Sequence, residues 1–336
     1  MPKKKKDITA SQRTRRWHGG VAAINNASAA TDIPDILAVW GKKLDLDMEG
    51  YNSLVDTTIV DAAIYAGIGD GGYASREELA AVAGPIISKR VIVERTLHLI
   101  NSVSEPARYP ILLKQYGQWL GVLGIDLTDF NRLFEGTPTI DDPPADATGK
   151  WAVYEAIYDD IPYASEDDLK TAFNNAVAAA LASQAVAAVN AAEDEDEMGD
   201  ALLAYADVLD LSVGPGSDYA ILETAGQAAA IEAVLEDRPA EVGYADAAAI
   251  KAAFDDAVED ELEVQAVAAV NSATAEEMGA VLVLYAVALT LDLTDYEALD
   301  EAKKGSVHEA LVGKDFADAA AVKDAFDAAV TLAQGE

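Results

Sequence analysis

The feature that most constrains the fold is an internal repeat in the second half of the chain. The segment QAVAAVNAAEDEDEMGDALLAYADVLDLS, which begins at Gln184, aligns with QAVAAVNSATAEEMGAVLVLYAVALTLDLT, which begins at Gln265. Each copy then ends in a closely related stretch, YADAAAIKAAFDDAV from Tyr244 and FADAAAVKDAFDAAV from Phe316. Similarity over a whole period of this kind is typical of repeat proteins, in which each unit packs against its neighbours.

Fainter copies of the same landmarks lie in the first half of the chain. An asparagine recurs after an apolar stretch at intervals of 76, 89 and 81 residues, followed by a Leu-Asp-Leu turn and an aromatic residue. The asparagines are Asn25, Asn101, Asn190 and Asn271, and the aromatic residues are Tyr51, Phe130, Tyr219 and Tyr296. We therefore predict an N-terminal arm, residues 1–18, and four helical repeats, residues 19–90, 91–180, 181–261 and 262–336.

The stretch shared by consecutive repeats is interpreted as one long helix. Residues 244–273 contain no Gly or Pro, and apolar side chains recur at helical spacing after the capping residue Asp246. At about 1.5 Å rise per residue, such a helix is roughly 40 Å long. It begins as the last helix of one unit and ends as the first helix of the next. The predicted fold class is all-α: an elongated tandem array of small helical bundles joined by shared long helices.

Two departures from the repeat predict local differences. The insertion GTPTIDDPPADATGK, residues 136–150, is rich in Pro, Gly and Asp, so we expect an exposed loop. Gly84-Pro85 interrupts the long helix of the first repeat, and proline removes a backbone donor. We expect this helix to kink or break there.

Charge is distributed unevenly along the chain. The net charge is −35, but the arm carries seven Lys and Arg residues against one Asp, so it is +6 and the remainder is −41. A body of that charge should repel nucleic acid and anionic membranes. A halophilic source is a second explanation of the acidity, and the excess of Lys over Arg argues against it.

Several classes of protein are disfavoured by what the sequence lacks. Without Cys there are no disulfides or thiolate metal sites. Polar DITASQRTRR follows the first lysines where a secretion signal has an apolar stretch, so we expect no secretion signal. No apolar run approaches the roughly 18 residues needed to span a bilayer.

The best candidate for a metal site is the segment DLDMEGYNSLVD, residues 45–56. Asp45, Asp47, Glu49 and Asp56 fall at four ligand positions of an EF-hand calcium loop. The last position is Asp rather than Glu, however, and the equivalent segment of the second repeat, IDLTDFNRLFEG, lacks the acidic pattern. A helix-start turn is the favoured interpretation, and we predict no metal and no other cofactor.

No other pattern indicates catalysis. The acidic run EDEDEMGD from Glu193 is interpreted as a solvated helix start, where carboxylates are favourable. The histidines belong to no HExxH or similar motif, and His98, on an apolar helix, is expected to be packed. The recurring asparagines fall where the long helices should end, and the recurring aromatic residues are expected to be core anchors. We predict that the protein is not an enzyme.

The N-terminal arm carries the one distinct functional signal. One interpretation is a disordered solubilising tail, and a second is a nucleic-acid arm, which needs only clustered Lys and Arg. The acidic body opposes the second. We favour a third, an anchor that docks on a partner protein with an aromatic residue as its apolar plug. The anchoring residues would be Lys3, Lys4, Lys5, Lys6, Arg13, Arg15, Arg16 and Trp17.

The repeats resemble the Ala-rich, all-helical tandem repeats of tailed-phage virion proteins and bacterial surface proteins. The resemblance is carried by VAAVN, the Leu-Asp-Leu turn with its aromatic residue, and YADAAAIKAAF. It covers about residues 20–332, is strong in the second half only, and implies no catalytic residues.

Together with the basic arm, the resemblance leads us to expect a structural virion protein: a fibre, spike or decoration protein assembled in the host cytoplasm. Its expected partners are capsid or tail proteins, with no membrane and no nucleic acid, and a homo-oligomer stays open. The first alternative is a cell-surface repeat protein or adhesin. The second is an intracellular scaffold, or an enzyme with an acidic site of an unfamiliar type.

Overall fold

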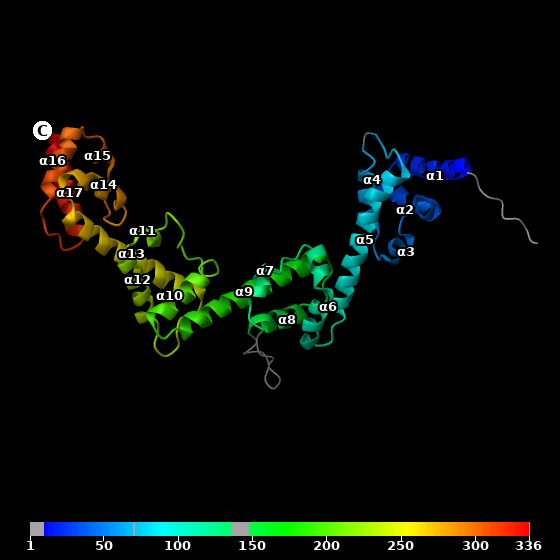
Figure 1. Cartoon of the computed structure of the whole chain (residues 1–336), viewed down its shortest axis with the longest axis horizontal. Coiled ribbons are helices and arrows are strands. Elements are labelled where there is room, and N and C mark those ends of the chain that lie inside the picture. The colour runs from blue at the N-terminus through cyan, green and yellow to red at the C-terminus, as the bar shows by residue number, and fades with distance from the viewer. Residues whose placement is uncertain (1–9, 70, 136–147, 336) are drawn as a thin grey trace, which may run out of the picture. The chain divides into compact units, whose positions relative to one another are not determined.

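The computed structural model describes residues 10–69, 71–135 and 148–335, with the side chains of residues 10–17, 114, 116 and 119 left undescribed. These residues form helices and turns and contain no strand, which confirms the all-α class (Figure 1). The chain divides into two compact units, Met1–Val177 and Ala178–Glu336. The predicted loop lies outside the described residues except for its last three positions.

The N-terminal unit is built from helices of very different length, and its last helix continues into the second unit. The helices are α1 (Ala10–Asn25), η1 (Ala30–Asp32), α2 (Ile33–Trp40), η2 (Gly41–Leu44), α3 (Met48–Ser53), α4 (Thr58–Ala66), α5 (Arg76–Asn101), η3 (Pro106–Arg108), α6 (Tyr109–Val122), α7 (Thr128–Arg132), α8 (Gly149–Asp159) and α9 (Glu166–Ala191).

The C-terminal unit repeats one order of elements twice: a medium helix, a turn, a one-turn helix, a further helix and a long helix. Its helices are α10 (Glu195–Ala204), α11 (Asp218–Ile221), α12 (Thr224–Glu236), α13 (Ala247–Ser272), α14 (Ala275–Leu284), α15 (Thr294–Glu297), α16 (Glu301–Leu311) and α17 (Ala319–Gly335).

Helix α13 shows why the long helices form where they do. The Asp246 carboxylate accepts a hydrogen bond from the backbone N–H of Ala249 at 2.9 Å and so caps the first turn. Buried side chains then recur every three or four residues from Ile250 to Val270. The predicted continuous helix and its cap are confirmed. Because α13 packs on α11 and α12 and also on α14 and α17, one helix serves two bundles of this unit.

Helix α5 corrects one prediction. Pro85 lies inside it, yet the helix is continuous over its 26 residues, so of the kink or break that we expected, the break is wrong. Pro85 is exposed, and so is Ala81, whose carbonyl would otherwise accept the missing backbone hydrogen bond, so water can take the place of the lost donor. Ala83 and Ile87, on either side of the proline, are fully buried and hold both halves of the helix against the core.

An asparagine clamp closes each of the four repeats. The asparagine lies within one residue of the end of the helix that opens the repeat. Its side-chain amide oxygen accepts a hydrogen bond from the backbone N–H of an aromatic residue. The amide nitrogen of the same asparagine donates to the carbonyl of that aromatic residue, which immediately precedes the next long helix. The pairs, with acceptor and donor distances, are Asn25–Tyr73 (2.8 and 2.9 Å), Asn101–Tyr163 (2.8 and 2.9 Å), Asn190–Tyr244 (2.7 and 2.9 Å) and Asn271–Phe316 (2.9 and 2.9 Å).

The clamped aromatic residue also fastens the helix that precedes it. In three repeats it is a tyrosine whose hydroxyl donates to a carbonyl of that helix: Tyr73 to Ile64, Tyr163 to Ile157 and Tyr244 to Val234, at 2.9, 2.8 and 2.7 Å. The residue before it is a glycine in the first and third repeats. Gly243 has φ +67°, and a Cβ added there would lie 2.5 Å from the Asn190 side chain, so only glycine fits the clamp at that position.

The Leu-Asp-Leu landmark is a left-handed helix end. One residue at this landmark has a positive φ in every repeat: the central Asp in the first and third repeats, and the residue just before the Ile-Asp-Leu or Leu-Asp-Leu triplet in the second and fourth. The next backbone N–H donates to the carbonyl five residues earlier, which satisfies the helix terminus. The left-handed residues are Asp45, Gly124, Asp210 and Thr290, and the hydrogen bonds are Leu46 to Gly41, Ile125 to Leu120, Leu211 to Ala206 and Leu291 to Ala286.

The recurring aromatic residues are core anchors, as predicted. Tyr51, Phe130, Tyr219 and Tyr296 are each exposed by 7% or less. The last three each pack on a phenylalanine of the following long helix, Phe173, Phe254 and Phe326, with ring centroids 5.4–5.6 Å apart. In the first repeat, the Tyr51 hydroxyl instead donates to the buried Asp61 at 2.7 Å.

Candidate functional sites

The N-terminal arm is only partly described. Lys3, Lys4, Lys5 and Lys6 lie outside the described residues, and Arg13, Arg15, Arg16 and Trp17 lie on α1 with side chains that are not described. Helix α1 begins at Ala10 and continues to Asn25, so the boundary predicted after residue 18 falls inside a helix. Gly19 lies inside this helix without interrupting it. The absence of a side chain at Gly19 lets the helix lie close to the Trp40 ring, because a Cβ there would lie 2.9 Å from the indole.

Three of the four acidic residues of the candidate calcium loop are held by the local backbone or by an ion pair. Asp45 is the left-handed residue of the helix end and pairs with Arg76 at 2.8 Å. Asp47 accepts from the Gly50 backbone as the cap of α3.

Asp56 accepts from the backbone and hydroxyl of Thr58, and these hydrogen bonds hold the pKa of its carboxyl below the usual value. Glu49 lies in the first turn of α3. Across the described residues, no group of three or more potential metal ligands comes together. The contacts are those of the helix-start turn that we favoured from the sequence.

The histidines occupy three different environments. His98 is exposed on α5, so the expectation that it is packed is wrong: its neighbours Leu97 and Ile100 take the buried face instead. His308, on α16, lies 2.8 Å from the Tyr296 hydroxyl and 6.0 Å from its ring, inside the last bundle. His18 is exposed on α1.

Buried tyrosines serve the core as neutral hydrogen-bonding groups. Desolvation is the main reason that the pKa values of Tyr51, Tyr109 and Tyr154 are raised to about 12. Groups with such pKa values stay protonated at neutral pH. They stabilise the bundles and are poorly suited to general acid–base chemistry there.

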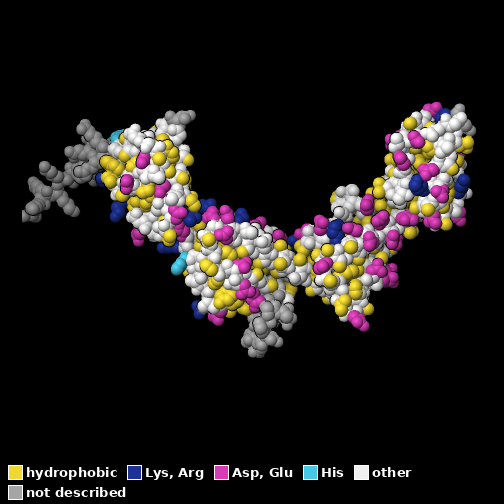
Figure 2. Space-filling view, turned by 180° about the vertical axis from the view of Figure 1, so that it is seen from behind, with side chains coloured by type: hydrophobic (Ala, Val, Ile, Leu, Met, Phe, Trp, Pro, Cys, Tyr) yellow, Lys and Arg dark blue, Asp and Glu magenta, His cyan; other side chains and the backbone are white. Residues whose placement is uncertain are grey.

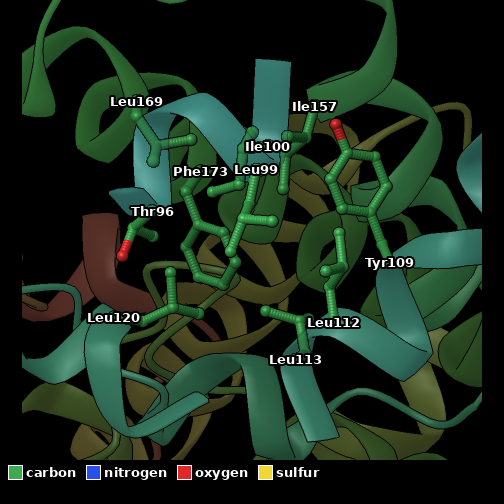
Figure 3. A pocket seen from close by; sticks show the side chains of 10 residues that line it. All are labelled: Thr96, Leu99, Ile100, Tyr109, Leu112, Leu113, Leu120, Ile157, Leu169 and Phe173. Carbon is green, nitrogen blue, oxygen red and sulfur yellow. The ribbon is translucent and has the colours of Figure 1, made fainter. Parts of the chain in front are cut away.

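An apolar cavity lies in the core of the second repeat, between α5, α6, α8 and α9 (Figure 3). Its volume, about 30 Å³, is enough for a water molecule. Its polar lining is two hydroxyls: Thr96 donates to the Ile92 carbonyl at 2.8 Å, and Tyr109 has no hydrogen-bond partner among the described atoms. With no ionisable side chain other than tyrosine on its wall, the cavity is a packing defect of the core.

The repeat junctions are fastened by side chains that the sequence analysis missed. Gln265, on α13, accepts from the Glu223 backbone at 2.7 Å and donates to the Ile221 carbonyl at 3.1 Å in the third repeat. The same amide nitrogen donates to the Tyr285 hydroxyl of the fourth repeat at 2.8 Å. One side chain on the shared helix therefore latches two neighbouring bundles together.

Two other long helices carry related latches. Gln184 on α9 donates to the Tyr205 hydroxyl at 2.8 Å, as Gln265 does to Tyr285. Glu94 on α5 accepts from the Val55 backbone at 2.8 Å, in the way that Gln265 accepts from Glu223. One sequence signal could have predicted the two glutamine latches: Gln184 and Gln265 open QAVAAVN in the two aligned copies, each six residues before the clamp asparagine.

A groove of about 530 Å³ lies beside α13 in the C-terminal unit. Its apolar wall includes Phe254, Val258 and Leu262, and it reaches Val287 after α14, which is 87% exposed. The carboxylates on its lining are Asp218, Asp255 and Glu259, and its one cation, Lys251, is paired with Asp255 at 2.9 Å. The groove thus combines an apolar wall with an excess of negative charge.

A second groove, of about 490 Å³, lies beside α5 in the N-terminal unit, and its charges are different. It is lined by Glu94, Arg95 and His98 and by the exposed Val55.

Acidic residues dominate the C-terminal unit more strongly than the N-terminal unit: residues 178–336 hold 34 of the 59 Asp and Glu but only 6 of the 24 Lys and Arg, a net charge of −28. Asp and Glu are conspicuous on the visible face of both units, with fewer Lys and Arg between them (Figure 2).

One described helix, α9, is long and apolar enough to cross a membrane by length and composition alone. The sequence analysis found no such run, because α9 reaches this composition through alanine rather than through large apolar residues. Its Leu169, Phe173 and Ala185 are buried in protein cores, and the core helix of a soluble protein passes the same test.

Comparisons with known proteins found no significant match to this chain among family models, curated proteins or solved structures.

Proposed function

We propose that this chain is a non-enzymatic structural protein of a virus particle, a fibre, spike or decoration protein. In this proposal the four repeats form an elongated tandem array joined by α5, α9 and α13. The N-terminal arm fixes the array to capsid or tail proteins.

The observation that carries the structural part of the proposal is the asparagine clamp with its latches. The same partly buried polar contact occurs four times, and each asparagine is hydrogen-bonded to the backbone of its own repeat. Devices of this kind fix geometry: a clamp sets the angle at which one long helix ends and the next begins. Selection for a fixed spacing between bundles explains why they recur, whereas a catalytic site needs polar groups that remain free to act.

The virion part of the proposal is supported by the resemblance of the repeats and by the opposite charges of arm and body. An arm of +6 favours docking on an acidic surface, and a body of −41 opposes close approach to the dense phosphate charge of nucleic acid. The cell-surface alternative and the intracellular scaffold use the same architecture, and they differ in what the arm binds.

The test is a deletion of residues 1–18 in cells that produce the particle. We expect the shortened protein to accumulate in folded form and to be missing from purified particles. A matched control replaces the exposed Lys42, Lys89 and Lys314 with Glu, which lowers the net charge by the same six units without touching the arm. If the shortened protein is incorporated as efficiently as the full chain, the arm is not the anchor. If no particle contains the full chain, the virion assignment is wrong.

A further inference from the structure

The acidic groove beside α13 has a chemical complement within the same chain. The groove carries three carboxylates against one already paired lysine, and the unit around it has a net charge of −28. The N-terminal arm is the one strongly basic segment, with Lys3–Lys6 in a row and three arginines after them.

The groove also has the right mixture of surfaces for a lysine-rich segment. Lysine and arginine side chains lay their aliphatic stems on apolar surface while the charged head stays in water or meets a carboxylate. Here Val258 and Leu262 offer the apolar wall, and Asp218 and Glu259 supply carboxylates on the same lining. Neither of these two carboxylates has an ion pair among the described residues, whereas Asp255 is paired with Lys251.

We propose that the N-terminal arm of one copy docks in this groove of a second copy. The proposal rests on the structural role proposed above and names a partner for the arm: the chain itself. Such an interface is head-to-tail, because the arm and the groove are different surfaces of one molecule. A head-to-tail interface closes into a ring or grows as an open chain of copies.

The experiment measures self-association of full-length variants by sedimentation velocity at low and high salt. An arm variant carries Lys3, Lys4, Lys5 and Lys6→Gln. A groove variant carries Asp218→Lys and Glu259→Lys. A control variant carries Glu195→Lys and Asp196→Lys, which reverses one Glu and one Asp on an exposed helix start away from the groove. Far-UV circular dichroism checks that each variant keeps its helix content.

We expect the wild type and the control to form oligomers that dissociate at high salt, since exposed charges are screened. We expect the arm and groove variants each to associate at least about fourfold more weakly. This is the combined effect of neutralising four exposed charges in the arm variant, or of reversing two in the groove variant, at the low end of the usual strength of exposed ion pairs. A mixture of the two variants then restores one interface and gives dimers but nothing larger, because each dimer has one intact arm–groove contact.

Three results would overturn the proposal. The first is a wild type that stays monomeric at every concentration, which includes the case of an arm that docks within its own chain. The second is equal weakening in the groove and control variants, which would show attraction to charge in general. The third is a mixture that stays monomeric. If the arm is still needed for incorporation into the particle in any of these cases, the anchoring function stands and only the second copy as partner is wrong.

Discussion

Replacing Asn190 with Ala removes one asparagine clamp without changing the surface charge. The Asn190 side chain makes two hydrogen bonds to the Tyr244 backbone, at 2.7 and 2.9 Å, across 54 residues of sequence. Each bond is worth roughly 0.5–1.5 kcal/mol net, so we expect a loss of about 1–3 kcal/mol in the free energy of unfolding of the C-terminal unit. With a urea dependence of about 2 kcal/mol per molar, a loss of 2 kcal/mol lowers the midpoint by about 1 M.

The chain offers a built-in reporter and a matched control for this measurement. All four tryptophans lie in residues 1–177, so tryptophan fluorescence follows the N-terminal unit, whereas far-UV circular dichroism follows both units. We expect Asn190→Ala to move part of the dichroism transition and to leave the fluorescence transition in place. Asn174→Ala lies on the same helix at an exposed position and should change neither by more than about 0.5 kcal/mol. A dichroism transition that Asn190→Ala leaves unchanged would refute the view that the clamp holds the bundle together.

Three further predictions follow from the same geometry. Gly243→Ala should cost at least about 1 kcal/mol, because its φ is +67° and the new Cβ meets Asn190, whereas Gly214→Ala, with nothing within 4 Å, should be close to neutral in urea unfolding; equal effects would contradict the steric argument. Gln265→Ala should loosen the junction between the third and fourth repeats, because it removes the side-chain bonds to Glu223 and Tyr285. We expect faster amide hydrogen exchange at Glu223 and Tyr285 and little change at Asn271. Unchanged exchange at Glu223 would show that the latch is dispensable. Burial raises the pKa values of Tyr51, Tyr109 and Tyr154 to about 12, so their stabilisation of the folded state is complete below pH 10 and is lost as the pH rises towards 12. Absorbance at 295 nm should therefore show that these tyrosines ionise well above pH 10 in the native protein and near pH 10 in urea. Identical titration curves in the two conditions would contradict this prediction.

The parts of the fold that the sequence predicted are those set by local signals. Helix α13 and its Asp246 cap depend on residues within a few positions of one another. The buried aromatic anchors were found because the repeat alignment placed Tyr219 and Tyr296 at one position. These features can be predicted from residues close in sequence or from positions that the repeat alignment makes equivalent.

Features that depend on tertiary contacts were missed or misjudged. The asparagines were recognised as helix ends, but their bonds to Tyr244 and Phe316 join residues 45 or more positions apart, and no local pattern shows that pairing. The helix through Pro85 stays continuous because burial on both sides outweighs one lost hydrogen bond. His98 was expected to be packed because its neighbours in the sequence are apolar. Leu97 and Ile100 lie on the face of α5 that packs on the core, whereas His98 lies on the exposed face.

The central proposal is that the four repeats form an extended array, and small-angle X-ray scattering tests this proposal most directly. A compact chain of 336 residues has a radius of gyration of about 20 Å. Long helices of 26 residues are each about 39 Å, so an array extended along three of them should exceed about 30 Å. The measurement is made on the arm variant at high salt, so that self-association does not contribute. A value above about 30 Å with a rod-like cross-section is the predicted result, and a value near 20 Å would contradict the array.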